Sequence, residues 1–431
     1  MVDSANGDPI SDIVGVVCTS SNNCWGVGRT RSGSIWHTLI VHWDGSAWAL
    51  VTSPVTSGSD TNVLNGVACS APNDCWAVGD HALANNLGFA QPVIEHWNGA
   101  SWTLDNSLLT APNQQDAVLN AVTCVGPNNC WAVGFGVVGN WTQTLVEHYD
   151  GTSWIVVTSA NTSARESNTL NAITCTAAND CWAVGNHDDG TPVGGAAPQQ
   201  SLTLHWDGTA WNVVASPNAT TQGNVLTGVS CTSTSDCKAV GYYTIGLIWQ
   251  TFVLHWNGSG WTQITSPNPN DDQDNRLFGV SCNSPNDCWA VGYFNAGENP
   301  FNVLAHTLAL HWDGSAWTTV PSPNRENFQI NFLNAITCLS SSECWAMGVS
   351  DTPNAITLAE HYLVLPRQLT SLGRDGDGVV TLVGAAAPGA SIQIEATADL
   401  STAFAPLTTV ITNASGLFTL IDNDSAAMPK R

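Results

Sequence analysis

The chain is poor in charged residues, and above all in positive ones. Only 10% of its 431 residues are charged, and 10 Lys and Arg stand against 34 Asp and Glu, which gives a formal net charge of −24. Lysine occurs only twice, at Lys238 and Lys430. An acidic surface repels phosphate backbones and anionic lipid headgroups. We therefore expect neither nucleic acid nor a membrane surface as a partner.

Long apolar stretches are missing as well. No uninterrupted apolar run reaches the ~18–20 residues of a membrane-spanning helix, so we expect no membrane span. The first ten residues, MVDSANGDPI, do not have the basic start and apolar core of a signal peptide. If the protein is exported, its signal has been removed or lies outside this sequence.

Unpaired cysteine is the third absence. The 14 cysteines form seven pairs, each six positions apart: Cys18 with Cys24, Cys69 with Cys75, Cys124 with Cys130, Cys175 with Cys181, Cys231 with Cys237, Cys282 with Cys288, and Cys338 with Cys344. Buried free thiols are one alternative, but this spacing without a second pair nearby is not a zinc pattern. Seven disulfides fit better. They imply an oxidising compartment and predict an exported protein, extracellular or at the cell surface.

A repeat occupies most of the chain. The stretch Leu119–Gly134, LNAVTCVGPNNCWAVG, has near-copies that begin at Ile13, Leu64, Leu170, Leu226, Leu277 and Leu333. Each copy predicts two strands around a hairpin loop. A third strand follows and ends in His-Trp or His-Tyr; in six copies an Asp-Gly or Asn-Gly turn then leads to a fourth strand. Four strands in each unit of roughly 50 residues are typical of a propeller blade. We predict an all-β, seven-bladed β-propeller with one disulfide per blade.

The ends of the chain differ from the repeat. We expect residues 1–12 to form an N-terminal arm or closing strand, residues 13–368 the propeller, and residues 369–431 a small β-sandwich-like domain. The seventh unit has neither the Asp-Gly turn nor a fourth strand after Tyr362. The arm, the segment Pro366–Leu372 or another protomer could add that strand.

Tryptophans that open the fourth strand are the candidate binding residues. Strand parity places each of them on the same face as the aromatic residue that ends the third strand. One interpretation is packing between blades, and the other is a ligand pocket. The candidates are Trp48, Trp102, Trp154, Trp211, Trp261 and Trp317.

Two other groups of residues are candidate metal sites. Seven third-strand histidines could in principle ring a channel, but the innermost strand of a blade is normally the first, so we expect packing groups and no metal. They are His42, His96, His148, His205, His255, His311 and His361. The acidic loops with Asp271, Asp272 and Asp274, or with Asp375 and Asp377, could bind Ca²⁺ weakly, although neither completes a calcium loop. We expect no other cofactor.

The strand–loop–strand start and the W-[DN]-G-x-x-W hairpin resemble the BNR/kelch-like β-propellers of secreted bacterial proteins, over about residues 12–365. Such propellers host lectins, hydrolases, assembly factors and scaffolds. Sialidase-type chemistry would need an arginine cluster and a Tyr/Glu pair. The arginines of the repeat region do not occupy equivalent blade positions: Arg29, Arg31, Arg165, Arg276, Arg325 and Arg367. We therefore expect no catalytic residues.

The sequence favours a non-enzymatic structural or interaction protein of the cell exterior. Its roles would be adhesion or self-assembly into filaments, with itself or cell-surface proteins as partners. Two alternatives remain open. One is a multivalent, lectin-like propeller that binds glycans, and the other is a glycoside hydrolase of sialidase-like fold.

Overall fold

The structure is a computed structural model of the whole chain. It describes residues 6, 10–54, 61–82, 89–105, 116–188, 198–297, 304–325, 330–351, 355–363, 368–374, 380–385, 391–396, 405–411 and 417–422, with side chains as far as Tyr362. Every regular element in these ranges is a β-strand. No helix among the described residues is able to cross a membrane.

Seven antiparallel units, here called blades 1–7, follow one another along the chain, and a parallel bridge between Ala305 and Ile330 joins the last two into one sheet. The first three blades consist of β1 (Ile10–Ser20), β2 (Asn23–Ser32), β3 (Ile35–Trp43) and β4 (Trp48–Val51); β5 (Thr61–Ala71), β6 (Asp74–Ala82), β7 (Ala90–Trp97) and β8 (Trp102–Leu104); and β9 (Ala117–Gly126), β10 (Asn129–Val138), β11 (Trp141–Tyr149) and β12 (Trp154–Val156). The next three consist of β13 (Asn168–Ala177), β14 (Asp180–Asp188), β15 (Gln199–Trp206) and β16 (Trp211–Val214); β17 (Asn224–Ser233), β18 (Asp236–Ile245), β19 (Ile248–Trp256) and β20 (Trp261–Gln263); and β21 (Asn275–Ser284), β22 (Asp287–Asn295), β23 (Ala305–Trp312) and β24 (Trp317–Val320). Blade 7 has β25 (Ile330–Ser340), β26 (Glu343–Asp351) and β27 (Ala355–Leu363).

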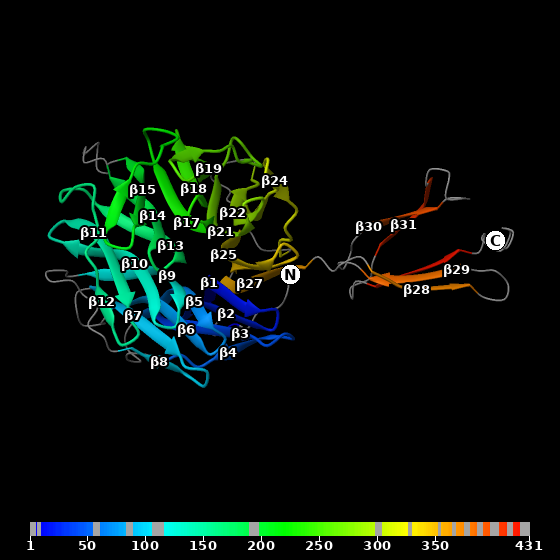
Figure 1. Cartoon of the computed structure of the whole chain (residues 1–431), viewed down its shortest axis with the longest axis horizontal. Helices are drawn as coiled ribbons and strands as arrows, with labels where there is room; N and C mark the ends of the chain where they lie inside the picture. Colours follow the sequence, from blue (N-terminus) through cyan, green and yellow to red (C-terminus); the bar gives the residue numbers. More distant parts are fainter. Residues whose placement is uncertain are drawn as a thin grey trace. The chain divides into compact units, whose positions relative to one another are not determined.

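The first strands of the blades form a closed ring. Each of β1, β5, β9, β13, β17 and β21 contacts the first strand of the next blade, and β25 contacts β1. Figure 1 shows these strands around the centre, with the later strands of each blade outside them. The predicted fold class, an all-β propeller of four-stranded repeats with one disulfide per repeat, is confirmed.

All seven predicted disulfides are present, and each closes the first hairpin of a blade. The bonds join Cys18 to Cys24, Cys69 to Cys75, Cys124 to Cys130, Cys175 to Cys181, Cys231 to Cys237, Cys282 to Cys288, and Cys338 to Cys344. In each blade the two cysteines face each other in the ladder, as Cys124 and Cys130 do between β9 and β10. Residues opposite each other in an antiparallel pair are close enough for a disulfide without distortion of the chain. The seven bonds fit a secreted, extracellular protein.

Blades pack through aromatic side chains on their facing surfaces. Trp25 of blade 1 lies 4.8 Å from Trp97 and 5.2 Å from Trp102 of blade 2, centroid to centroid, and it meets Trp102 edge to face. Edge-to-face pairs are a favourable arrangement for aromatic rings. The same contact recurs around the ring, for example between Trp131 and Trp211.

Side-chain hydrogen bonds join the first strands of neighbouring blades. Asn65 Nδ2 donates to the carbonyl of Leu119 in the next blade at 3.0 Å, and Asn334 Nδ2 donates to the carbonyl of Ile13 at 2.9 Å. The second of these bonds links blade 7 to blade 1. Equivalent hydrogen bonds to the next blade are donated by Asn120, Asn171 and Thr227.

Asn6 links the N-terminal arm to blade 7. Its Oδ1 accepts hydrogen bonds from N–H and Oγ1 of Thr357 on β27, at 2.8 and 3.0 Å. Asn161, Asn218, Asn268 and Asn324, which follow the fourth strands of blades 3–6, accept the same backbone bond from their own third strands. The arm thus places an asparagine where the other blades use the residue after their fourth strand, which favours the arm among the three candidates for closing the ring.

We expect Asn6→Ala to destabilise the propeller by about 1 kcal/mol, because it removes an acceptor shared by two donors of a buried residue. Asn218→Ala, at the equivalent position of blade 4, should cost a similar amount. Differential scanning calorimetry measures both. An unchanged midpoint for Asn6→Ala beside a lowered one for Asn218→Ala would mean that the arm does not hold blade 7.

A second unit begins at Tyr362. It contains a three-stranded sheet of β28 (Gln368–Arg374), β29 (Val380–Ala385) and β32 (Leu417–Asp422), and a two-stranded sheet of β30 (Ser391–Ala396) and β31 (Ala405–Ile411). The segment Pro366–Leu372 was one candidate for the missing strand of blade 7. Its described residues belong to β28, which pairs with β29.

Candidate functional site

One layer of the propeller breaks the regularity of the repeat. In every blade the first two strands pair through an Ile or Leu opposite a glycine, as in Ile13 with Gly28 and Leu277 with Gly292. The next pair, further from the disulfide, differs from blade to blade. These rim pairs are Asp12 with Arg29, Val63 with Asp80, Val118 with Phe135, Thr169 with Asn186, Val225 with Tyr242, Arg276 with Tyr293, and Phe332 with Val349.

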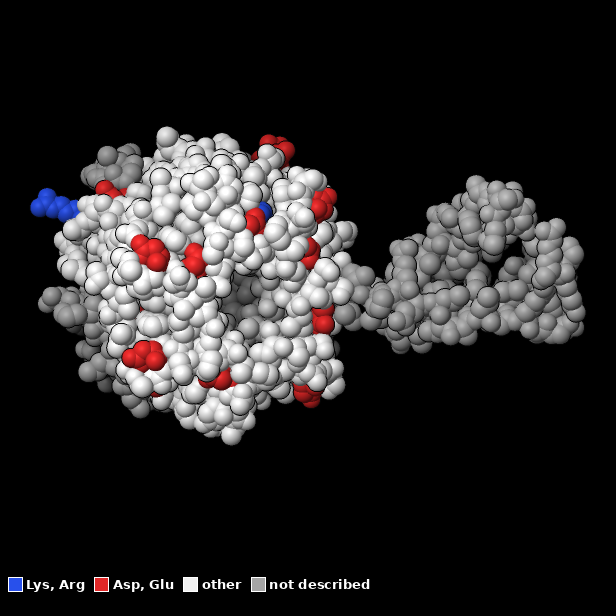
Figure 2. Space-filling model, in the orientation of Figure 1, with Lys and Arg blue, Asp and Glu red and all other residues white. Residues whose placement is uncertain are grey.

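The rim pairs lie at the end of the central channel away from the disulfides. Asp12 precedes Cys18 by six residues on the same strand, which corresponds to about 20 Å along it. Figure 2 shows the hollow at the centre of the ring of blades, with acidic side chains scattered over the face in view. Because these pairs differ while an Ile or Leu opposite a glycine recurs in every blade, the seven positions are candidates for a site at this end of the channel.

Arg276 lies among aromatic rings of two blades. Its guanidinium carbon is 3.5 Å from the ring centroid of Trp249, 4.9 Å from that of Tyr242 and 5.7 Å from that of Tyr293. Cation–π contacts of this kind hold a guanidinium without neutralising it. No carboxylate of the described residues forms an ion pair with Arg276, so its charge is available to a ligand.

Burial raises the pKa of Tyr293 to about 12, against a smaller lowering by the charge of Arg276. Tyr293 also packs against Phe332 of blade 7, at 4.3 Å between ring centroids. Phe332 continues the aromatic lining from blade 6 towards blade 1.

A cavity of about 560 Å³ lies where blade 7 meets blade 1. It is lined by Asp12, Arg29, Arg31 and Trp36 of blade 1, by Phe278 of blade 6, and by residues of blade 7 that include Phe332 and Asp351. The guanidinium carbons of Arg29 and Arg31 lie 4.9 and 5.7 Å from the Trp36 ring centroid. Two guanidinium groups, an indole and two carboxyl groups therefore share one concave site.

Asp12 is a largely buried carboxyl group of this cavity. Its Oδ2 lies 3.3 Å from Nη2 of Arg29, and its Oδ1 accepts a hydrogen bond of 2.9 Å from Asn334 Nδ2. Burial raises the pKa of Asp12 above its ordinary value, although the charge and hydrogen bond of Arg29 and the hydrogen bond of Asn334 lower it in part. A carboxyl group of this kind retains its proton to higher pH than an exposed aspartate.

Asp80 is the rim carboxyl of blade 2. Burial raises its pKa to about 6; the hydrogen bond from Asn65 lowers it in part, the Asp116 carboxylate raises it, and the charge of Arg29 lowers it. Perturbed carboxyl groups therefore occur in neighbouring blades, close to the same arginine. Such groups cluster at functional sites.

The six predicted binding tryptophans lie elsewhere, between the blades. Their exposed fractions are only 3–6%. Trp48, for example, meets Trp345 of blade 7 edge to face at 5.3 Å. In this structure blade-to-blade contacts cover the rings of Trp48, Trp102, Trp154, Trp211, Trp261 and Trp317.

Six of the seven predicted packing histidines are hydrogen-bonded within their own blade to the residue before the second cysteine, and His361 lies at ion-pair distance from the equivalent Glu343. The partners are Asn23 for His42, Asp74 for His96, Asn129 for His148, Asp180 for His205, Asp236 for His255, Asp287 for His311 and Glu343 for His361, at 2.6–3.4 Å. Most of these histidines also contact the tryptophan of the second strand, as His96 does with Trp76 at 4.1 Å. Burial lowers the pKa of His42 and His148, which favours their neutral form.

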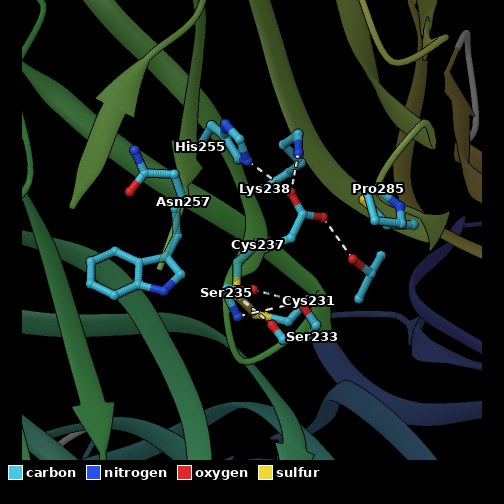
Figure 3. A network of polar contacts seen from close by, with 12 residues as sticks. Cys231, Ser233, Ser235, Cys237, Lys238, His255, Asn257 and Pro285 are labelled. Atoms are coloured by element: carbon cyan, nitrogen blue, oxygen red, sulfur yellow. Dashed lines mark hydrogen bonds and ion pairs between the residues drawn. A yellow bond between two sulfur atoms is a disulfide. The ribbon is translucent and has the colours of Figure 1, made fainter. Parts of the chain in front are cut away.

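Blade 5 differs from the others at the tryptophan position of the second strand. Lys238 stands there, only 1% exposed, and its Nζ donates to Asp236 Oδ1 at 2.9 Å. Asp236 also accepts hydrogen bonds from His255 and Thr232, as the network in Figure 3 shows. Burial alone would raise the pKa of Asp236, but the hydrogen bonds from Thr232 and Lys238 and the lysine charge lower it overall.

Only one of the two candidate calcium loops, that of Asp271, Asp272 and Asp274, lies among the described residues. Asp274 Oδ1 accepts a hydrogen bond from the Trp249 N–H at 3.1 Å, and Asp375 and Asp377 lie outside the described residues. Among the residues that the structure describes, no three His, Cys, Asp or Glu side chains form a group that could hold a metal ion. Calcium binding at Asp271, Asp272 and Asp274 stays a prediction.

Comparison with known proteins yields matches of fold only. The chain matches no protein family and no curated protein sequence. A solved structure described as a polysaccharide lyase of family PL25, an ulvan lyase bound to -[GlcA(1-4)Rha3S]-, is similar with a TM-score of 0.54 and 9% identity, over 84% of this chain and 94% of that one. A second structure of a PL25 ulvan lyase has a TM-score of 0.52 and 9% identity, over 80% and 91%. A GH74 xyloglucanase from Xanthomonas campestris has a TM-score of 0.49 and 11% identity, over 87% and 58%.

These similarities correct the expected function. The prediction of a non-enzymatic adhesion or assembly scaffold is contradicted by the two PL25 structures of similar fold, which are described as polysaccharide lyases. We expected no catalytic residues because the arginines occupy non-equivalent blade positions. A site on the ring axis takes a different residue from each blade, so non-equivalent residues such as Arg29 and Arg276 are what such a site requires.

Proposed function

We propose that the protein is a secreted carbohydrate-active enzyme that binds an acidic polysaccharide across the rim pairs and cleaves it in the cavity between blades 7 and 1. The observation that carries the proposal is the composition of that cavity: Arg29, Arg31, Trp36, Asp12 and Asp351 together in about 560 Å³. Concave sites with aromatic walls and a few convergent polar groups are typical ligand sites.

The positive charges support an anionic ligand. The chain has only 10 Lys and Arg, yet three of its arginines, Arg29, Arg31 and Arg276, lie on aromatic rings at this end of the channel. Arg31 and Arg276 form no ion pair with any described carboxylate. Guanidinium groups bind carboxylates and sulfates through two parallel hydrogen bonds, so these arginines suit a chain with uronate or sulfate groups.

Stacking supports a polysaccharide rather than a small anion. Trp36, Phe278 and Phe332 line the cavity. Tyr293 contacts Phe332, and the guanidinium of Arg276 lies close to the rings of both Tyr293 and Trp249. The aromatic side chains that line the cavity offer stacking faces to sugar rings. The similar PL25 structure contains a bound uronate-containing glycan, which fits the same ligand class.

For cleavage we assign the roles of two carboxyl groups. Asp12 gives its proton to the glycosidic oxygen as the bond from that oxygen to C1 breaks. Asp351 takes a proton from the water whose oxygen forms the new bond to C1, so that one water is consumed and two shorter chains are released. A protonated and an ionised carboxyl group on opposite sides of the bond are the standard requirement for this reaction. We further propose that the propeller is of the BNR/kelch-like class and that the protein acts outside the cell.

The test uses purified protein and two sets of polysaccharides. Polygalacturonate, alginate and heparin form the acidic set, and xyloglucan and dextran the neutral one. We expect retention on acidic columns and release of reducing ends from at least one acidic polymer. If the new reducing ends appear together with the ultraviolet absorbance of an unsaturated uronate, the reaction is an elimination and not a hydrolysis. Failure to bind or cleave any acidic polymer would contradict the proposal.

A further inference from the structure

We propose a second carbohydrate site on the opposite end of the propeller: a notch between blades 1 and 2 that binds one ring of a neutral sugar. The notch is a cavity of about 490 Å³ lined by Trp25, His42, Asn23, Asn73 and Trp97, among others. It lies at the disulfide hairpins, since Asn23 directly precedes Cys24 and Asn73 lies two residues before Cys75. It is therefore separate from the rim pairs and does not depend on the function proposed for them.

Two polar groups in the notch suit sugar hydroxyls. His42 Nε2 donates to Asn23 Oδ1 at 2.7 Å, which leaves Nδ1 of the neutral imidazole as an acceptor and Nδ2 of Asn23 as a donor. A hydroxyl group needs one partner of each kind. Trp97 is partly exposed at the notch and lies 4.8 Å from Trp25, so an indole surface borders these polar groups.

No charged side chain among the described residues lines the notch. Blades 2, 4, 5 and 6 pair their histidine with an aspartate and blade 7 pairs it with a glutamate, whereas blades 1 and 3 use the neutral amides of Asn23 and Asn129. In a chain of formal net charge −24, an uncharged concave surface with aromatic walls favours a neutral ligand over an ionic one.

The interface between blades 5 and 6 provides an internal contrast. Lys238 replaces the tryptophan that corresponds to Trp25, and its Nζ lies 5.6 Å from the Trp312 ring centroid. Its histidine partner is the carboxylate of Asp236. This interface has a lysine in place of the indole floor and carries ionised groups, so we expect no neutral sugar to bind there.

The experiment places one bulky residue in the notch from outside. Asn73 is exposed in the hairpin loop of blade 2, so Asn73→Trp fills the notch without touching the core. Asn286→Trp is the matched control, because Asn286 has the same position in blade 6, beside the interface with Lys238. Isothermal titration calorimetry with cellohexaose and mannohexaose measures the number of molecules bound per chain.

We expect the wild-type protein to bind at least one of these oligosaccharides, Asn73→Trp to lose one molecule from the stoichiometry, and Asn286→Trp to bind as the wild type does. Asn73→Trp should bind the acidic polymer as the wild type does, and Arg276→Ala should still bind the neutral oligosaccharide. The proposal for the notch and the proposal for the rim pairs can therefore be contradicted independently. No binding of either oligosaccharide, or an unchanged stoichiometry in Asn73→Trp, would overturn the assignment.

Discussion

Asp12→Asn is expected to lower the turnover of the acidic polysaccharide by at least about 100-fold while the KM changes little. A positioned general acid contributes roughly 10²- to 10⁴-fold, and asparagine has no proton to give. The variant keeps the shape of the side chain, and its Oδ1 can still accept the bond from Asn334. Initial rates of reducing-end release, measured over a range of polymer concentrations, separate the two constants.

The pH profile adds a second readout. Because burial raises the pKa of Asp12, the acid form persists to higher pH than in an exposed aspartate, and activity should fall as the pH rises through that raised pKa. Asp44→Asn is the control, since Asp44 is an exposed turn residue at the disulfide end, where hydrogen bonds from Ser46 and Ala47 lower its pKa to about 2. Full activity in Asp12→Asn would remove Asp12 from the reaction. Loss of binding together with activity would make it a structural partner of Arg29.

Glu95→Gln is expected to stabilise the propeller at alkaline pH and to flatten the dependence of its stability on pH. Glu95 is fully buried between blades 1 and 2, and its carboxyl oxygens lie 2.8 and 3.0 Å from Ser53 Oγ. Burial raises its pKa to about 8, against a smaller lowering by the bond from Ser53. Glutamine reproduces the protonated form and cannot ionise.

The sign follows from the raised pKa. Below the ordinary value of 4.5 the carboxyl group is protonated in both states and folding carries no penalty. Between pH 4.5 and about 8 the unfolded chain ionises first, so the free energy of unfolding falls by up to about 1.4 kcal/mol per pH unit. The stability contributed by protonated Glu95 is thus lost as the pH rises towards 8.

Two further buried glutamates act in the same direction. Burial raises the pKa of Glu147 well above its ordinary value and that of Glu360 to about 7; the Asp105 carboxylate adds to the first, and the bond from Ser322 opposes the second. Urea denaturation at pH 5 and pH 8.5 tests the idea, with Glu166→Gln in a surface loop as the control. Equal pH dependence in the wild type and Glu95→Gln would show that Glu95 ionises freely in the folded protein.

The blade framework could be predicted from the sequence because local patterns determine it. The spacing of Cys124 and Cys130 requires a hairpin, and the alternation around them requires paired strands. The segment Pro366–Leu372 was a candidate strand for blade 7, but the strand Gln368–Arg374 pairs with β29 of the C-terminal unit.

The rim pairs could not be found by looking for similarity among the repeats. A search for equal residues at equal positions favours the framework, such as Leu119 opposite Gly134, and discards Arg29 and Arg276 as scattered. A signal was present, however. The residue after the Val-Gly or Met-Gly of the second strand differs among the repeats, from Arg29 to Asp80 and Phe135, although the Gly before it is constant. Only closure of the ring, with Asn334 bonded to Ile13, brings such residues together.

The most direct test of the central claim is a crystal structure of the Asp12→Asn variant with an acidic oligosaccharide taken from the polymer that the wild type cleaves. We predict that the sugar lies over the rim pairs, with an acidic group on Arg29, Arg31 or Arg276, and a glycosidic bond between residues 12 and 351 in the cavity of blades 7 and 1. An oligosaccharide bound only at the disulfide end or outside the ring would contradict the account.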